Sequence, residues 1–175
     1  MQVFHSIDNF LLAKQSRIAL TIGNFDGLHQ GHTHLLKTLR LEADKLDLPT
    51  VVLTFQQHTS VKITPETPKV TLTNSDQKSK LIKDSRLVDF LILQDFSNEF
   101  KSIVAEDFIT TVLVNQLKVK LIVIGANHRF GKDRKGDLDL LKSQSLIFGF
   151  KVLGVDLLKV DGEVISSSLI RKKNV

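Results

Sequence analysis

Two histidines three residues apart stand in a glycine-rich segment, a pattern typical of a phosphate-binding site. His29 and His32 lie in the stretch of residues 23–32, which contains three glycines. Residues three apart at a helix start lie on one face, and that end of a helix presents unpaired N–H groups and the positive end of the helix dipole. Two imidazoles beside those groups would form a phosphate site, whereas the interpretation without a function is a turn at Asp26 and Gly27 with two incidental histidines. A metal site formed by Asp26 with both histidines is the alternative, although the sequence supplies no obvious further ligand.

A second segment with residue types that suit anions, residues 125–137, combines glycines with arginines and lysines. It does not fit a P-loop, because five residues rather than four separate Gly125 from Gly131. Asp133 also stands where a P-loop needs Ser or Thr to hold magnesium. By itself the segment is as consistent with a solvated basic loop as with a binding site.

Three consecutive serines near the end of the chain form the third candidate. Ser166, Ser167 and Ser168 stand where a last short helix is expected to begin, and hydroxyls at such a position cap backbone N–H groups. The same hydroxyls can donate to an anion. Arg171 follows one turn later, and its planar guanidinium suits phosphate oxygens. Serine caps are common, so this motif gains its meaning from the other two segments.

Apolar strands and amphipathic helices alternate along the chain, which predicts an α/β fold with a doubly wound parallel sheet. The expected strands are residues 17–22, 50–55, 87–93, 121–124 and 150–155, and the expected helices include residues 32–46, 104–117 and 138–146. A helix start at 73–76 and a tight hairpin at 160–164 are also predicted. Ligands bind beyond the carboxyl ends of such strands, so the three segments should meet at one edge of the sheet.

Composition narrows the classes of protein. The 175 residues suit one domain, and the lack of cysteine excludes disulfide scaffolds, thiolate zinc sites and a Cys nucleophile. No apolar run approaches the roughly 20 residues of a membrane span, and the N-terminus lacks a signal-peptide pattern, so no membrane partner and a cytoplasmic location are expected. The net charge of +5 suits polyanionic substrates. A nucleic-acid partner is not expected, because the basic residues are scattered and form no recognition motif.

Together the segments resemble the nucleotidylyltransferase superfamily with its H-x-G-H motif, which has a Rossmann-like fold. More closely, the chain resembles the FAD synthetase (FMN adenylyltransferase) module of bacterial bifunctional riboflavin kinase/FAD synthetases. The similarity covers about residues 18–171 and is most specific in residues 21–32 and 166–171. Residues 54–58 are similar to the family's T-F-x-P-H-P pattern, and residues 125–137 to its flavin-side loop.

The resemblance implies Mg²⁺-dependent transfer of AMP from ATP to FMN, which yields FAD and pyrophosphate. The catalytic residues it implies are His29, His32 and Arg171. The ATP-binding residues it implies are Gly23, Asn24, Phe25, Asp26, Gly31, Ser166, Ser167 and Ser168. The flavin-binding residues it implies are His58, Asn127, Phe130 and Arg134. The family's riboflavin kinase domain is expected to be absent from residues 1–175, because the predicted elements already occupy residues 17–171.

The chain departs from the family pattern on the loops expected to meet FMN. Gln57 and Thr59 replace two prolines, His128 replaces a usual Phe, and Asp133 stands where Gly is common. Two alternatives to an FMN adenylyltransferase therefore stay open. One is adenylyl or cytidylyl transfer to another phosphorylated acceptor, and the other is a non-catalytic relative that binds flavin or nucleotide.

Overall fold

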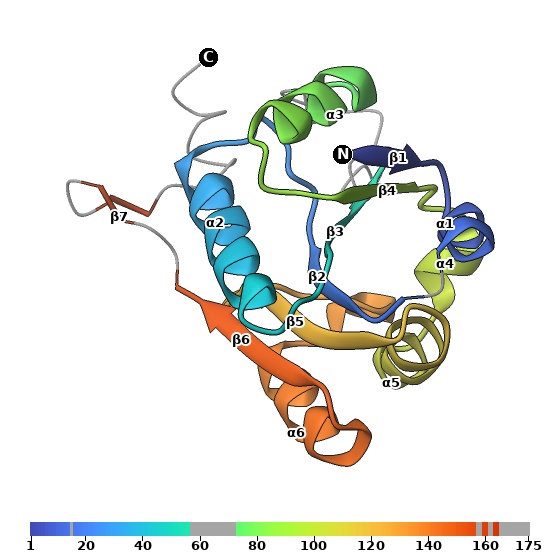
Figure 1. The fold of residues 1–175 in the computed structure, drawn as a ribbon. Helices are drawn as coiled ribbons and strands as arrows, with labels where there is room; N and C mark the ends of the chain where they lie inside the picture. Colours follow the sequence, from blue (N-terminus) through green and yellow to red (C-terminus); the bar gives the residue numbers. More distant parts are fainter. Residues whose placement is uncertain (15, 57–72, 157–158, 161–162, 165–175) are drawn as a thin grey trace, which may run out of the picture.

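Six parallel strands form the centre of the structure (Figure 1). The computed structural model describes residues 1–14, 16–56, 73–156, 159–160 and 163–164. The strand order is β1-β4-β3-β2-β5-β6, and every neighbouring pair is parallel. The strands are β1 (Gln2–Phe4), β2 (Ile18–Ile22), β3 (Thr50–Phe55), β4 (Phe90–Gln94), β5 (Val119–Gly125) and β6 (Lys151–Val155).

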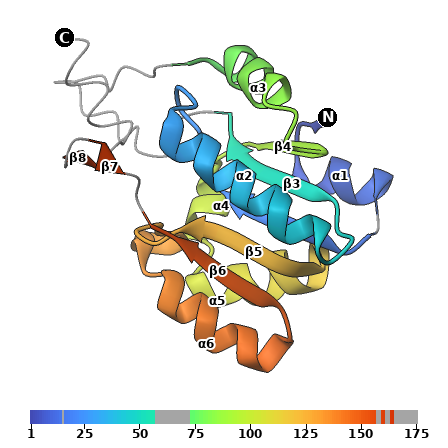
Figure 2. The same ribbon diagram turned by 60° about the vertical axis from the view of Figure 1, so that its left-hand side comes forward.

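Helices cover both faces of this sheet, as Figure 2 shows from a second side. They are α1 (Ile7–Ala13), α2 (Gln30–Asp44), α3 (Ser75–Asp84), α4 (Asn98–Ser102), α5 (Ala105–Asp107), the π-helix η1 (Phe108–Gln116), the 3₁₀ turn η2 (Lys132–Arg134) and α6 (Leu138–Phe148). Helices α2 and α3 pack on one face through residues such as Leu36 and Ile82. Helices α1, η1 and α6 supply Phe10, Ile109 and Leu141 to the core on the other face.

The central strands are apolar on both faces because both faces are covered. All residues of β2 and β3 are buried, which is typical of strands inside a parallel α/β sheet. From β2 the chain passes through α2 to β3, which is the neighbour of β2 on one side within the sheet, and α2 packs on one face. Strand β5 is the neighbour of β2 on the other side, and the helix η1 that precedes it packs on the opposite face. Between β2 and β5 the strand order therefore reverses direction, and the crevice beyond their carboxyl ends is where such sheets bind ligands.

The predicted doubly wound sheet is confirmed, with differences at its margins. The expected strand at 87–93 begins only at Phe90, and the expected helix at 104–117 consists of α5 followed by the π-helix. Strand β7 (Lys159–Val160) pairs antiparallel with β8 (Glu163–Val164), which confirms the hairpin. Strand β1 and helices α1 and α4 were not predicted, because they are short. The helix expected from Ser166 lies outside the described residues.

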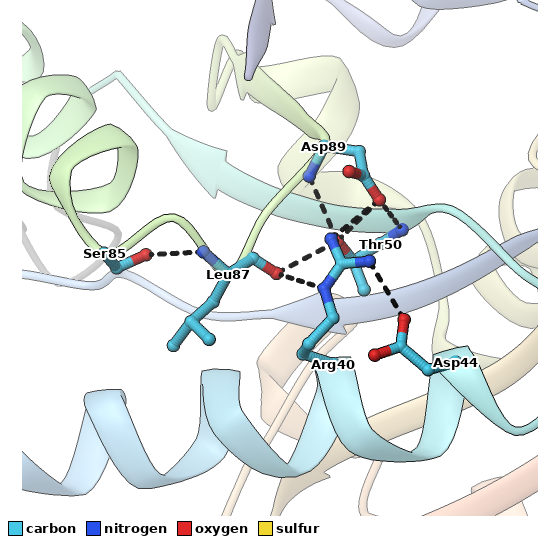
Figure 3. A network of polar contacts seen from close by, with 6 residues as sticks. All are labelled: Arg40, Asp44, Thr50, Ser85, Leu87 and Asp89. Atoms are coloured by element: carbon cyan, nitrogen blue, oxygen red, sulfur yellow. Dashed lines mark hydrogen bonds and ion pairs between the residues drawn. The ribbon is translucent and has the colours of Figure 1, made fainter.

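A polar network closes the amino-terminal end of the sheet, opposite the crevice (Figure 3). The Asp89 carboxylate accepts hydrogen bonds from the Thr50 N–H at 2.8 Å and from Arg40 Nη2 at 2.8 Å. Arg40 also donates from Nε to the Leu87 carbonyl at 3.1 Å, so it ties α2 to the turn before β4. Burial raises the pKa of Asp89, but the hydrogen bonds from Thr50 and Arg40 outweigh it and leave the pKa below its usual value.

Replacing Asp89 with Asn should lower the free energy of unfolding by about 1–2 kcal/mol, because charge-assisted hydrogen bonds to Thr50 and Arg40 are weakened. Urea denaturation measures the change. Asp84→Asn is the matched control, since Asp84 pairs with Lys80 on the exposed side of α3 and such pairs contribute little. Equal stability of Asp89→Asn and the wild type would show that the network does not hold this end of the sheet.

Candidate active site

The turn after β2 has a strained, buried backbone. Phe25 and Leu28 have φ angles of 47° and 31°, although neither is glycine. Such conformations cost about 1–3 kcal/mol each and persist where the surroundings enforce them, often at functional sites. The Phe25 side chain is fully buried, at 0% exposure. Gly23 lies directly beneath it, and a Cβ there would stand 3.1 Å from the Phe25 ring, which is a tight contact.

Asp26 anchors this turn to the segment that opens α3. Its side chain is 2% exposed, and Oδ1 accepts hydrogen bonds from the Thr73 N–H at 2.9 Å and from the Thr73 hydroxyl at 3.1 Å. The Gly27 N–H in turn donates to Thr73 Oγ1 at 3.2 Å. The carboxylate is thus engaged in shaping the turn, which argues against the metal site considered from the sequence. Among the described residues, no group of three His, Asp or Glu side chains is placed to hold a metal ion.

His29 and His32 meet at the start of α2. Their rings stack with centroids 3.8 Å apart and planes inclined by 22°. The His32 ring also packs on Phe25, with centroids 5.0 Å apart. Among the described residues, Nδ1 of both histidines is buried and has no hydrogen-bond partner. Buried polar atoms are normally paired, so these two nitrogens mark the start of α2 as a candidate site.

Burial keeps both imidazoles neutral. It lowers the pKa of His32 to about 3, with His29 and Lys78 adding to the effect and Asp26 opposing it. Burial also lowers the pKa of His29, again against the influence of Asp26. A neutral imidazole has one N–H donor and one acceptor nitrogen. The pair can therefore hold phosphate oxygens by hydrogen bonds, without a positive charge of its own.

The amino terminus of α2 adds backbone donors to the histidines. His29 precedes the helix with extended backbone angles, and its side chain makes no capping hydrogen bond. The first N–H groups of a helix have no partner within the helix, and they carry partial positive charge suited to phosphate. Gly31, in the first turn of this 15-residue helix, leaves room for an approaching ligand. The predicted grouping of residues 23–32 at one carboxyl edge is confirmed.

The loop of residues 125–137 lies across the crevice, after β5. Lys132 donates from its backbone N–H to the Ile103 carbonyl at 2.7 Å, and Phe130 and Gly136 form an antiparallel bridge. Gly131 has a φ of +71°, and a Cβ there would stand 2.7 Å from Ala105 Cα. Backbone contacts therefore hold the loop in place, which a merely solvated basic loop would not need.

The residues expected on the flavin side differ in their surroundings. Asn127 and Arg134 are exposed, whereas Phe130 is 8% exposed and packs on Phe108 with ring centroids 5.6 Å apart. Nε2 of His128 is buried and has no hydrogen-bond partner within the part of the chain that the structure describes. Burial lowers the pKa of His128 to about 4, and Arg134 adds to the effect. The remaining predicted site residues lie outside the described part of the chain: His58, Ser166, Ser167, Ser168 and Arg171.

Two residues beneath the turn were not predicted as site residues. Thr73 holds Asp26, as described above, and Lys78 is buried in α3 at the end of β3. One signal for Lys78 was available in the sequence. It precedes Ile82 by four residues, so the two lie on the same face of the helix, and that face is buried.

Known proteins are similar to this chain over nearly its whole length. Residues 11–169 match the family model of FAD synthetase. The bifunctional riboflavin kinase/FMN adenylyltransferase of Escherichia coli K12 is 33% identical over 172 residues, which cover 98% of this chain and 55% of that protein. The protein of the same description from Haemophilus influenzae is 36% identical over 172 residues, with the same coverage. The chain therefore spans about half the length of the curated relatives it matches.

Solved structures agree on the fold. A crystal structure described as a macrolide-efflux protein from Streptococcus pneumoniae superposes with a TM-score of 0.82 at 28% identity, covering 98% of this chain and 56% of that one. Within the described residues of this chain, no helix has the length and apolar character to cross a membrane. Pantothenate synthetase from Thermus thermophilus has a TM-score of 0.62 at 19% identity, covering 99% of this chain and 70% of its own, and shows the Rossmann-like fold alone. With its stacked histidine pair at the switch point and a family match over nearly its whole length, this chain belongs to the FAD synthetase family.

Proposed function

We propose that this chain is an FMN adenylyltransferase, which transfers AMP from ATP to FMN and releases pyrophosphate. The observation that carries this proposal is the stacked pair of neutral histidines, with unpartnered Nδ1 atoms, at the start of α2. It lies in a turn that the FAD synthetase family model covers. Phosphorylated substrates also suit a chain with a net charge of +5.

The reaction needs alignment and charge stabilisation more than a reactive side chain. A phosphate oxygen of FMN attacks the α-phosphorus of ATP, and the bond from that phosphorus to the bridging oxygen of the β-phosphate breaks. Pyrophosphate leaves with the electron pair. Because the FMN phosphate is already a nucleophile, no covalent enzyme intermediate is required. The enzyme contributes by holding the two phosphates in line and by donating hydrogen bonds where charge develops.

The residues of the crevice take the following roles. His29, His32 and the first N–H groups of α2 would bind the ATP phosphates, and the turn of Gly23, Asn24, Phe25, Asp26 and Gly31 shapes that pocket. Ser166, Ser167, Ser168 and Arg171 would hold the outgoing pyrophosphate. His58, Asn127, Phe130 and Arg134 would meet FMN. This arrangement separates the nucleotide side, after β2, from the acceptor side, after β5.

Mg²⁺ would arrive bound to ATP. Magnesium prefers oxygen ligands and is commonly held by substrate phosphates together with few protein groups. The buried histidines are neutral near pH 7, so the bound ion would supply positive charge that they do not. Small-molecule substrates, rather than nucleic acid, follow from this assignment, and the use of ATP favours a cytoplasmic location.

The direct test is to incubate the purified chain with ATP, Mg²⁺ and FMN. We expect FAD and pyrophosphate, separated by chromatography, and no product when Mg²⁺ is chelated. Riboflavin in place of FMN is the control substrate, and we expect it to remain unchanged. Transfer of AMP to another phosphorylated acceptor, with no FAD formed, would refute the FMN assignment and favour the alternative transferase.

Replacing His32 with Asn should lower kcat about a hundredfold or more, the scale of losing one preorganised donor to a transition state. The affinity for FMN should change little, because His32 lies on the nucleotide side of the crevice. His34→Asn is the matched control, since His34 is exposed on the same helix. An equal loss of FMN affinity and turnover would contradict this placement of His32.

The imidazole of His32 should remain neutral between pH 8 and pH 5, because burial lowers its pKa to about 3. The chemical shift of its ring C–H in NMR, assigned by comparison with His32→Asn, measures this directly. An unfolded histidine titrates near 6.5, so protonation opposes folding below that value, and the contribution of His32 to stability falls as pH decreases from 6.5 toward 3. A titration of His32 near pH 6.5 in the folded protein would contradict the prediction.

A further inference from the structure

Lys78 is a buried lysine at the carboxyl end of β3, close to the histidine pair. It is 4% exposed, and its ammonium donates to the Phe55 carbonyl at 2.8 Å and to the Thr54 hydroxyl at 3.4 Å. Both acceptors are neutral oxygens. Burial lowers the pKa of Lys78, and Asp26 opposes this effect. Packing alone does not explain such a residue, because an apolar side chain of similar length would fill the space without desolvating a charge.

The ammonium is linked to the phosphate-binding turn through one hydroxyl. Thr54 Oγ1, which accepts from Lys78, donates to the Asn24 carbonyl at 3.1 Å. Five residues earlier in the chain, Thr73 holds Asp26. The turn after β2 is therefore held directly by Thr73, through Asp26 and Gly27, and by Thr54 of β3, through the Asn24 carbonyl, and Lys78 reaches it through Thr54.

Lys78 also acts on the histidines by its charge. The groups that set the pKa of His32, besides burial, are His29 and Lys78, which lower it, and Asp26, which raises it. Removing the lysine would remove one of the influences that counter the effect of Asp26 on His32. The pKa of His32 would then rise, although burial would still hold it below its ordinary value.

We propose that Lys78 is a positioning residue for AMP transfer, which acts through Thr54 on the phosphate-binding turn and through its charge on His32. The inference rests on the proposed function. The ammonium holds the turn in a binding conformation, and its charge lowers the pKa of His32 further than burial alone does. Its two described hydrogen bonds go to β3, so we assign it a positioning role rather than a catalytic one.

The first test is Lys78→Met, which keeps the length of the side chain and removes its charge. We expect kcat to fall about ten- to hundredfold, the effect of misplacing groups that must align substrates, with little change in KM for FMN. The pKa of His32, measured by NMR without substrates, should rise. Lys80→Met is the matched control on α3, because Lys80 is exposed and pairs only with the exposed Asp84 among the described residues. It should change neither quantity.

Two further variants separate the link from the charge. Thr54→Val removes the hydroxyl between Lys78 and Asn24 but keeps the ammonium, so kcat should fall while the pKa of His32 stays low. Lys78→Arg retains the charge and should also keep the His32 pKa low. If Lys78→Met does not fold, these two variants still test the proposal. In that case, a wild-type kcat in Thr54→Val would overturn it.

An unchanged His32 pKa in folded Lys78→Met would overturn the proposal, as would a loss of kcat explained by its unfolded fraction alone. A failure of this proposal for Lys78 can be distinguished from a failure of the proposed function. The His32 titration and the binding of a non-hydrolysable ATP analogue need no FMN. A wild-type chain that makes no FAD would refute the transferase, while weaker analogue binding and a raised His32 pKa in Lys78→Met would still support the role of Lys78 at the nucleotide site.

Discussion

The buried carboxylate of Asp26 is the contact on which the geometry of the crevice depends. It lies in a turn whose backbone is strained at Phe25 and Leu28, and such a turn keeps its shape only if its neighbours enforce it. Thr73 does so with its N–H and its hydroxyl, both donated to one carboxylate oxygen. Because the turn leads directly into α2, the same contact sets where the histidines and the helix terminus point.

In the proposed function, the histidine pair would bind phosphate with groups that carry no charge. Burial depresses the pKa of each ring, and stacking at 3.8 Å would make two imidazolium ions repel each other. Hydrogen bonds in a water-poor site are stronger than in bulk solvent, and donors held in advance need not reorganise as charge develops. In the proposed reaction, the positive end of α2 and the Mg²⁺ that accompanies ATP would supply the positive charge near the phosphates.

The order of elements and the phosphate-binding turn were predictable, because each follows from short-range patterns. Buried strands appear as apolar runs, and the turn combines glycines with histidines at helical spacing. The anchors were not predictable in the same way. Thr73 and Lys78 are distant in sequence from Asp26 and His32, and only the fold brings them together. The first strand, of three residues, is too short to show a period, and the helix after residue 104 continues as a π-helix without a change in its apolar spacing.

The two ends of the sheet have different roles: the amino end stabilises the fold, and the carboxyl end holds the candidate site. At the amino end, a network of Arg40, Thr50 and Asp89 joins α2, β3 and the approach to β4, whereas the strained turn lies at the carboxyl end. Substitutions that stabilise the amino end lie a full strand length from the proposed substrate site. The fold therefore offers a region in which evolution or protein engineering can raise thermal tolerance while the turn, where rigidity and activity are in tension, is left alone.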